Sequence, residues 1–162
     1  MLTIESDNTH RPTLGDNSSI VCFKACVRGL EEALGTRAAL VSLRAAGRKR
    51  GRSLVASLNL DGTVTSPEQA AAPLRTALGA DGTRLCIVED ITKEGEDVYV
   101  VKLSETICSC LEEQGSKAEL SYTFGAVQGA IESLIGEKVR GKQVESVLRG
   151  GQYDSLRFEI FR

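Results

Sequence analysis

A leucine repeat interrupted by two glycines, in residues 36–60, constrains the fold of this chain more than any other feature. Its apolar positions recur at spacings of 3, 4, 4, 3 and 4 residues: Leu40, Leu43, Gly47, Gly51, Leu54 and Leu58. These spacings place all six on one side of a single α-helix, which we expect the sequence DGT at residues 61–63 to end. An interior glycine destabilises a helix by about 1 kcal/mol relative to alanine. Two glycines on the apolar side therefore predict that another helix or a ligand closely approaches the backbone there.

The same segment is rich in basic residues, and three of them, Arg44, Arg48 and Arg52, follow one another at one-turn intervals along the adjoining flank. The chain has 162 residues and a net charge of −2, with four Phe, three Tyr and no Trp. This balance argues against a nucleic-acid-binding protein, which usually carries a basic excess and aromatic stacking residues. No dinucleotide fingerprint or P-loop occurs. Two interpretations of the flank stay open, an anion-binding surface and a solvated basic face.

Three further helices are predicted from apolar periodicity. The first follows Ser18 and Ser19 and ends at Gly35, with the apolar stripe Ile20, Phe23, Val27, Leu30 and Leu34. The second has a capping-box signature from Ser66 to Gln69 and ends at Gly79, and Pro73 interrupts it, so that we expect a short or a kinked helix. The third ends at Gly136 and has the stripe Leu120, Phe124, Val127, Ile131 and Leu134.

Residues 84–91 and 97–105 are rich in β-formers and flank a charged turn, which predicts a hairpin. Residues 138–148 and 155–161 predict a second pair of strands, whereas 105–117 fits either a strand end or a short helix. The order α-α-α-β-β-α-β-β indicates an α+β fold, an antiparallel sheet with helices packed against it. We expect a polar, flexible N-terminal tail over residues 1–17 and a single domain over 18–162.

Recognisable catalytic machinery is missing from the sequence. The single histidine, His10, lies in the polar tail, so Cys–His and Ser–His–acid catalysis are disfavoured. Cys108 and Cys110 could begin a metal or redox site, but zinc sites usually need a second pair or histidines. We expect no metal site and five reduced, mostly buried thiols. We also expect a cytoplasmic protein, because no run of 18 apolar residues and no signal-peptide core occurs.

Three segments in the right order resemble the vinyl-reductase domain family: LGTRAALVSLRAAGRKRGRSL, FGAVQGAIESLIGEKV and VESVLRGGQYDSLRFEI. The resemblance spans residues 30–162. It implies a twisted antiparallel sheet with helices on one side, related to small subunits of the vesicle-tethering transport-protein-particle complex, often as a dimer. Many family members carry cysteines in the terminal segment where this chain has Leu148 and Leu156. Any metal or thiol function of those cysteines therefore does not transfer to this chain.

The resemblance implies a non-enzymatic module that encloses a hydrocarbon-like or tetrapyrrole-like ligand between helices and sheet. The predicted lining residues are Gly47, Gly51, Leu54, Tyr122, Phe124, Val127 and Ile131. Arg44, Arg48 and Arg52 would hold a ligand carboxylate at the mouth of this pocket. One alternative is an assembly protein, in which the glycines pack a partner helix and the first helices or the sheet form a homodimer. Another is a tetrapyrrole vinyl reductase or an accessory subunit of one, although no nicotinamide or flavin fingerprint is present.

Overall fold

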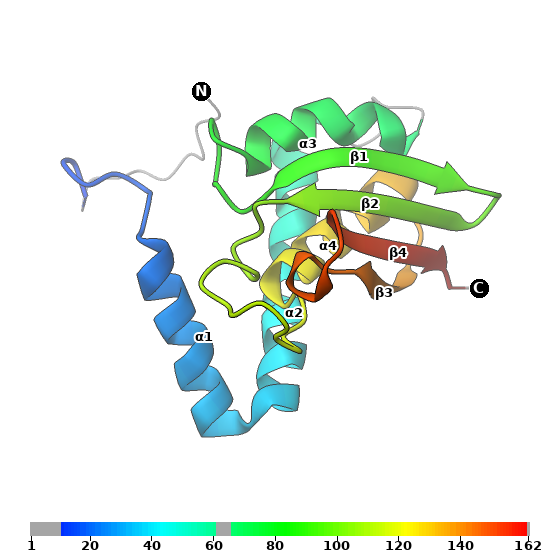
Figure 1. The fold of residues 1–162 in the computed structure, drawn as a ribbon. Helices are drawn as coiled ribbons and strands as arrows, with labels where there is room; N and C mark the ends of the chain where they lie inside the picture. Colours follow the sequence, from blue (N-terminus) through cyan, green and yellow to red (C-terminus); the bar gives the residue numbers. More distant parts are fainter. Residues whose placement is uncertain (1–10, 61–65, 162) are drawn as a thin grey trace.

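The computed structural model describes residues 11–60 and 66–161, and its helices and strands follow the predicted order (Figure 1). The helices are α1 (Ile20–Leu34), α2 (Thr36–Ser57), α3 (Ala71–Leu78) and α4 (Tyr122–Ile135). The strands are β1 (Ile87–Glu94), β2 (Val98–Ser104), β3 (Val139–Glu145) and β4 (Asp154–Ile160). Two short 3₁₀ turns, η2 (Pro67–Ala70) and η3 (Val147–Arg149), precede α3 and β4. In this part of the chain, no helix is both long and apolar enough to cross a lipid bilayer.

The four strands form one antiparallel sheet in the order β1-β2-β4-β3. Val101 of β2 lies opposite Ile91 of β1 on one side and Leu156 of β4 on the other. These three side chains and Phe158 are buried, whereas Arg157, between Leu156 and Phe158, is only half-buried. This alternation means that one face of the sheet is covered and the other is open. The predicted α+β class, with helices on one side of the sheet, is confirmed.

Helix α4 is the most buried helix and lies between the sheet and α2 (Figure 1). The rings of Phe124 and Phe158 lie 5.5 Å apart, which connects α4 to the inner face of the sheet. The opposite side of α4 packs along α2. α4 therefore contacts protein on two sides, which explains why small and apolar residues dominate its sequence.

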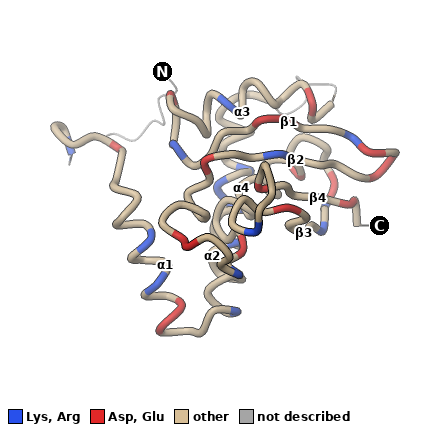
Figure 2. Tube along the Cα trace, in the orientation of Figure 1, with Lys and Arg blue, Asp and Glu red and all other residues tan. Residues whose placement is uncertain are grey.

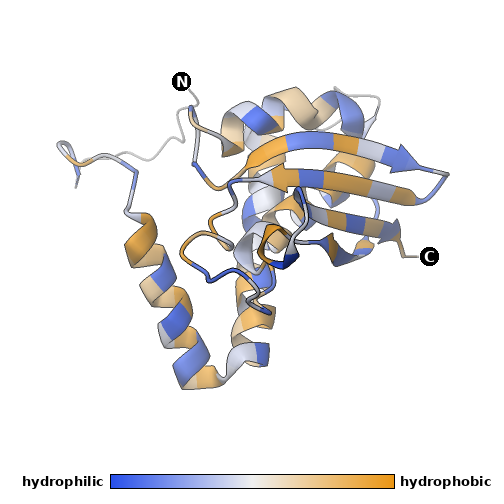
Figure 3. Ribbon diagram, in the orientation of Figure 1, coloured by the Kyte–Doolittle hydropathy of each residue, from blue (hydrophilic) through white to orange (hydrophobic). Residues whose placement is uncertain are grey.

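Helix α1 differs from α4 because it projects from the rest of the molecule beside the first half of α2 (Figure 1). Its predicted apolar stripe faces α2 but is only half-buried, and Leu34 at its end is 53% exposed. The one buried residue of α1 is the charged Lys24. Figure 3 shows orange apolar bands along this projecting hairpin of α1 and α2. Apolar periodicity correctly located this helix but did not indicate how little of it is covered.

Several helix ends confirm the predictions. The Ser19 hydroxyl accepts a hydrogen bond from the backbone N–H of Val21, and Gly35, Gly79 and Gly136 close their helices as expected. The capping box at Ser66 is wrong, because its hydroxyl makes no capping bond and the backbone enters a 3₁₀ turn instead. The helix is short, as expected, with eight residues in α3, and Pro73 lies in its first turn, where a missing N–H is tolerated.

Predictions were also made for two segments between the helices and strands. Residues 105–117, predicted as a strand end or a short helix, form neither and instead consist of turns and extended chain. Residues 61–63, expected to end the long helix, lie outside the described residues, as do residues 1–10 of the expected tail. The helix itself already ends at Ser57.

Candidate functional site

Gly47 and Gly51 contact the backbone of α4. A Cβ atom at Gly47 would lie 2.1 Å from the carbonyl oxygen of Tyr122, and one at Gly51 would lie 1.9 Å from that of Ala126. Neither distance is possible for a real side chain, so both glycines are required by the approach of the two helices. The sequence left open whether a ligand or a helix lies against them. The structure places a helix of the same chain there.

The contact is reciprocal, because α4 contributes two glycines of its own. A Cβ atom at Gly125 would lie 2.0 Å from the carbonyl oxygen of Arg44, and one at Gly129 would lie 2.0 Å from that of Arg48. We call Gly47, Gly51, Gly125 and Gly129 the glycine contact. The i, i+4 spacing of the two glycines in α4 matches that in α2, and this signal in the sequence could have predicted the pairing.

The flank of Arg44, Arg48 and Arg52 lies beside the glycine contact and binds carboxylates of the chain itself. Arg44 donates hydrogen bonds to Glu119 (2.8 Å) and to the carbonyl oxygen of Leu120 (3.2 Å). Arg48 and Arg52 both donate to the carboxylate of Glu132, at 2.7 Å from Arg48 Nε and 2.8 Å from Arg52 Nη2. These arginines therefore already hold carboxylates, as the chemistry of the flank suggested. Their predicted role toward a ligand carboxylate remains a prediction.

Glu132 is the electrostatic centre of this flank, and its side chain is only 4% exposed. Burial by itself raises the pKa of Glu132, but hydrogen bonds from Arg48, Arg52 and the N–H of Val139 bring it below its usual value. The hydrogen bonds with Glu132 and its negative charge in turn raise the pKa of the Arg48 guanidinium despite partial desolvation. Glu132 therefore connects α2, α4 and the start of β3.

The other predicted lining residues occupy the layer between the helices and the sheet. Leu54, Phe124, Val127 and Ile131 are buried members of one continuous core. Tyr122 is half-buried at the start of α4, with its ring 5.9 Å from that of Phe23 in an edge-on arrangement. The structure thus brings the predicted residues together around α4, and their role in ligand binding remains a prediction.

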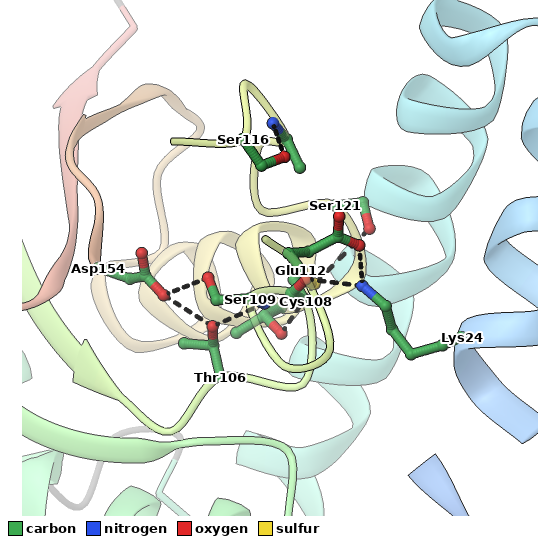
Figure 4. A network of polar contacts seen from close by, with 10 residues as sticks. Lys24, Thr106, Cys108, Ser109, Glu112, Ser116, Ser121 and Asp154 are labelled. Carbon is green, nitrogen blue, oxygen red and sulfur yellow. Dashed lines mark hydrogen bonds and ion pairs between the residues drawn. The ribbon is translucent and has the colours of Figure 1, made fainter. Parts of the chain in front are cut away.

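A polar network that was not predicted from the sequence lies in the segment between β2 and α4 (Figure 4). Asp154, which is fully buried, accepts hydrogen bonds from the hydroxyls of Thr106 and Ser109, both at 2.7 Å. It also accepts from the side-chain amide of Gln143 and the N–H of Val147. Four donors satisfy this buried carboxylate, which attaches the segment to β4.

The same segment is attached to α1 by Lys24. Its ammonium group donates to the carbonyl oxygen of Cys108 at 2.9 Å and forms an ion pair with Glu112 (Figure 4). The thiol of Cys108 lies 3.3 Å from the Thr123 hydroxyl and 3.6 Å from that of Ser121. The residues around Cys108 therefore connect α1, the segment between β2 and α4, and the first turn of α4.

All five thiols are free, but the expectation that most are buried is wrong. Cys86 and Cys108 are buried, Cys110 is half-buried, and Cys22 and Cys26 are exposed on the uncovered side of α1. Burial raises the pKa of Cys86 to about 12, with the nearby Cys108 and Asp154 acting in the same direction. Among the described residues, no three His, Cys, Asp or Glu side chains gather closely enough to hold a metal ion.

The fold is similar to that of two proteins of known structure. One is the phenol-responsive sensory domain of the transcription activator PoxR with phenol, at 14% identity and a TM-score of 0.68 over 90% of this chain and 76% of that chain. The other is a trafficking protein particle complex subunit 3 from Naegleria fowleri covalently bound to palmitic acid, at 14% identity and a TM-score of 0.63 over 88% and 93%. No protein-family model and no curated protein sequence matches the chain. These likenesses establish a shared fold, in agreement with the fold implied by the vinyl-reductase resemblance.

Proposed function

We propose that this chain is an assembly module that forms a homodimer through the uncovered side of α1. The observation that carries this proposal is Gly29, because a Cβ atom there would meet nothing within 4 Å. Each of the four glycines inside α2 and α4 is explained by a contact with helix backbone. Gly29 destabilises α1 in the same way as any helical glycine, and nothing within the described chain explains it. A second helix approaching this position would.

The residues around Gly29 have the character of a helix-packing surface. We define the outer face of α1 as its exposed small residues, together with Val21 at the edge: Val21, Cys22, Ala25, Cys26, Gly29 and Ala33. Helical periodicity places them on one side, opposite the stripe that faces α2. Small residues along one side of a helix permit a close approach of two helix backbones.

The charges of α1 favour an antiparallel arrangement of two copies. Lys24 and Arg28 precede Gly29, whereas Glu31 and Glu32 follow it, so the helix has a basic half and an acidic half (Figure 2). Arg28 and Glu32 lie one turn apart on the same flank of the outer face. A two-fold axis at Gly29 therefore sets Arg28 of each copy near Glu32 of the other.

The same arrangement also covers Val21, an exposed apolar side chain at the edge of the outer face. Val21, Leu34 and Val41 are 62%, 53% and 62% exposed, and Leu34 and Val41 line a surface hollow at the turn between α1 and α2. Covering Val21 removes exposed apolar surface from water, whereas Leu34 belongs to the stripe that faces α2 and lies outside the outer face.

Light scattering coupled to size-exclusion chromatography tests the homodimer. We expect the wild-type mass to be twice the 17.4 kDa of the chain, and Gly29→Arg to shift the protein to the monomer. Ala45→Arg, a change at an exposed position of α2, is the control and keeps the dimer. Thiol labelling of Cys22 and Cys26 should be slow in the wild type and fast in Gly29→Arg. A wild type that is monomeric at tens of micromolar contradicts the proposal.

We propose small-molecule binding as a second function. It is supported by the buried hydroxyl and thiol groups of Cys108, Ser121 and Thr123 beside the apolar core. Ligand sites are typically apolar with a few such polar groups. The likeness to a phenol-responsive domain and to a subunit bound to palmitic acid suggests apolar ligands. Of the predicted lining, Leu54, Tyr122, Phe124, Val127 and Ile131 stay our choice for the site, whereas Gly47 and Gly51 lie against the backbone of α4.

Native mass spectrometry of freshly purified protein tests this second function, because a co-purified ligand appears as added mass and a tetrapyrrole also absorbs visible light. Thermal unfolding with added phenol or palmitic acid provides the complementary measurement, since a ligand that binds the native state raises the melting temperature with its concentration. A protein that carries no ligand and responds to neither addition contradicts this function.

A further inference from the structure

Arg50 differs from the three arginines of the flank on the same helix. Arg44 binds Glu119, and Arg48 and Arg52 share Glu132. The Nη2 atom of Arg50 is shielded from solvent and has no hydrogen-bond partner. Unsatisfied buried donors are rare in native proteins, and a charged one is especially unfavourable. This nitrogen therefore marks a position where a group is expected to bind.

The surroundings of Arg50 indicate what kind of group fits. Arg50 shares a side of α2 with Ala39 and Leu43, which are buried and half-buried. The charge of Arg50 also acts on Tyr122. Burial raises the pKa of the Tyr122 phenol, and the positive charge of Arg50 partly offsets this by lowering it. The Tyr122 ring in turn contacts Phe23 of α1. Arg50 thus lies on the side of α2 that carries Ala39 and Leu43, and its charge acts on Tyr122 at the start of α4.

The charged residue next to Phe23 in the sequence already has partners. Lys24, the residue after Phe23, is bound to Glu112 and to the carbonyl oxygen of Cys108. Among the ion pairs of the described residues, none includes Arg50. A group with one negative charge balances one guanidinium, whereas a phosphate monoester with nearly two charges would need a second free cation. A carboxylate has the matching charge and accepts two parallel N–H bonds from arginine.

We propose that Arg50 binds the carboxylate of an apolar monocarboxylic acid, whose hydrocarbon part lies against Phe23 and Tyr122 at the junction of α1, α2 and α4. This inference rests on the small-molecule-binding function and specifies its ligand class. It also adds Arg50 to the arginines predicted from the sequence to anchor the ligand carboxylate. Arg50 is added because the guanidinium groups of those three arginines already bind Glu119 and Glu132.

Titration calorimetry at pH 7.4 with octanoic acid and 1-octanol tests the proposal, because the two probes share a chain and differ in the charged group. We expect the wild type to bind the acid about tenfold more tightly or better, the factor typical of a charge-assisted hydrogen bond. Arg50→Gln should bind both probes equally. Arg50→Lys, which keeps the charge but loses the paired donors, should retain part of the preference. Arg37→Gln, an exposed change on the same helix, is the control and keeps all of it.

The possible outcomes separate this inference from the function on which it rests. Equal binding of acid and alcohol by the wild type, or a preference that survives in Arg50→Gln, overturns the role of Arg50 but leaves small-molecule binding in place. Binding of neither probe, with no ligand in the native mass spectrum, overturns both.

Thermal unfolding without ligand is the folding check. Removing an unpaired charge should leave the melting temperature of Arg50→Gln unchanged or raise it, whereas a clear decrease indicates that Arg50 has a structural partner and overturns the assignment.

Discussion

Gly51 and Gly29 both interrupt an amphipathic helix, yet they belong to regions of opposite character. At Gly51, α2 and α4 approach so closely that a Cβ atom would lie 1.9 Å from a carbonyl oxygen. Around this contact the charges are paired, as Arg48 and Arg52 are with Glu132. At Gly29, α1 presents small residues to solvent, and a Cβ atom would meet no described atom within 4 Å. The reason for a glycine in a helix can therefore be inferred only when the atoms that lie against it are known.

The largest effect is expected for Gly51→Ala. The added methyl group meets the backbone of Ala126, which cannot rotate away, so α2 and α4 must separate and their shared core must repack. We expect the free energy of unfolding to fall by about 3 kcal/mol or more. Urea unfolding followed by circular dichroism provides the measurement. Replacing a helical glycine by alanine changes stability by about 1 kcal/mol through helix propensity alone. A loss in the free energy of unfolding smaller than this would show that the two helices separate easily, and Gly51 would then not differ from Gly29.

The next effect is expected for Glu132→Gln, which breaks two ion pairs beside the glycine contact. We expect the free energy of unfolding to fall by about 2 kcal/mol at pH 7. Because the native pKa of Glu132 lies below its unfolded value, its contribution is complete above the unfolded pKa and is lost as pH falls through the native pKa. The difference between wild type and variant should therefore shrink below about pH 4.5.

Glu119→Gln is the matched control for this pH experiment. Glu119 also pairs with an arginine of the flank, but its side chain is 52% exposed. We expect a loss of no more than about 0.5 kcal/mol, as for most exposed pairs. Equal losses for the two variants would show that burial does not distinguish these ion pairs.

Lys24→Met tests how α1 is attached to the rest of the molecule. The variant keeps an apolar side chain of similar length but removes the ion pair with Glu112 and the bond to Cys108. We expect a loss of about 1 to 2 kcal/mol and faster hydrogen exchange of α1, with the exchange of α4 unchanged. Lys49→Met, at an exposed position of α2 outside the proposed interface, should alter neither. Unchanged exchange in α1 of Lys24→Met would contradict the anchoring role.

The smallest effect is expected for Gly29→Ala, and its sign is opposite to that of Gly51→Ala. Alanine favours the helix and meets nothing at this position. At protein concentrations low enough to keep the chain monomeric, we expect the free energy of unfolding to rise by about 1 kcal/mol. Urea unfolding at two concentrations makes the comparison. A destabilised monomer would show that a contact within the chain already occupies this position.

The order of elements, the antiparallel sheet and most helix ends could be predicted because they depend on local patterns. The apolar stripe of α4 and the caps at Ser19 and Gly136 are determined by residues within a few positions of each other. The capping box at Ser66 failed because a local pattern can satisfy more than one backbone conformation. The networks around Asp154 and Lys24 were not predictable, since their partners in the segment between β2 and α4 lie 45 to 88 residues away in the chain.

Helical periodicity in the sequence was enough to establish a long helix with two glycines on its apolar side and arginines on the adjoining flank. Tertiary packing was needed to bring α4 against Gly47 and Gly51, and to pair the arginines of the flank with Glu119 and Glu132. The same packing leaves Gly29 facing open space and Nη2 of Arg50 without a partner. The two kinds of information differ because periodicity sets the direction of a side chain from its helix, whereas the group that it meets depends on how distant segments pack.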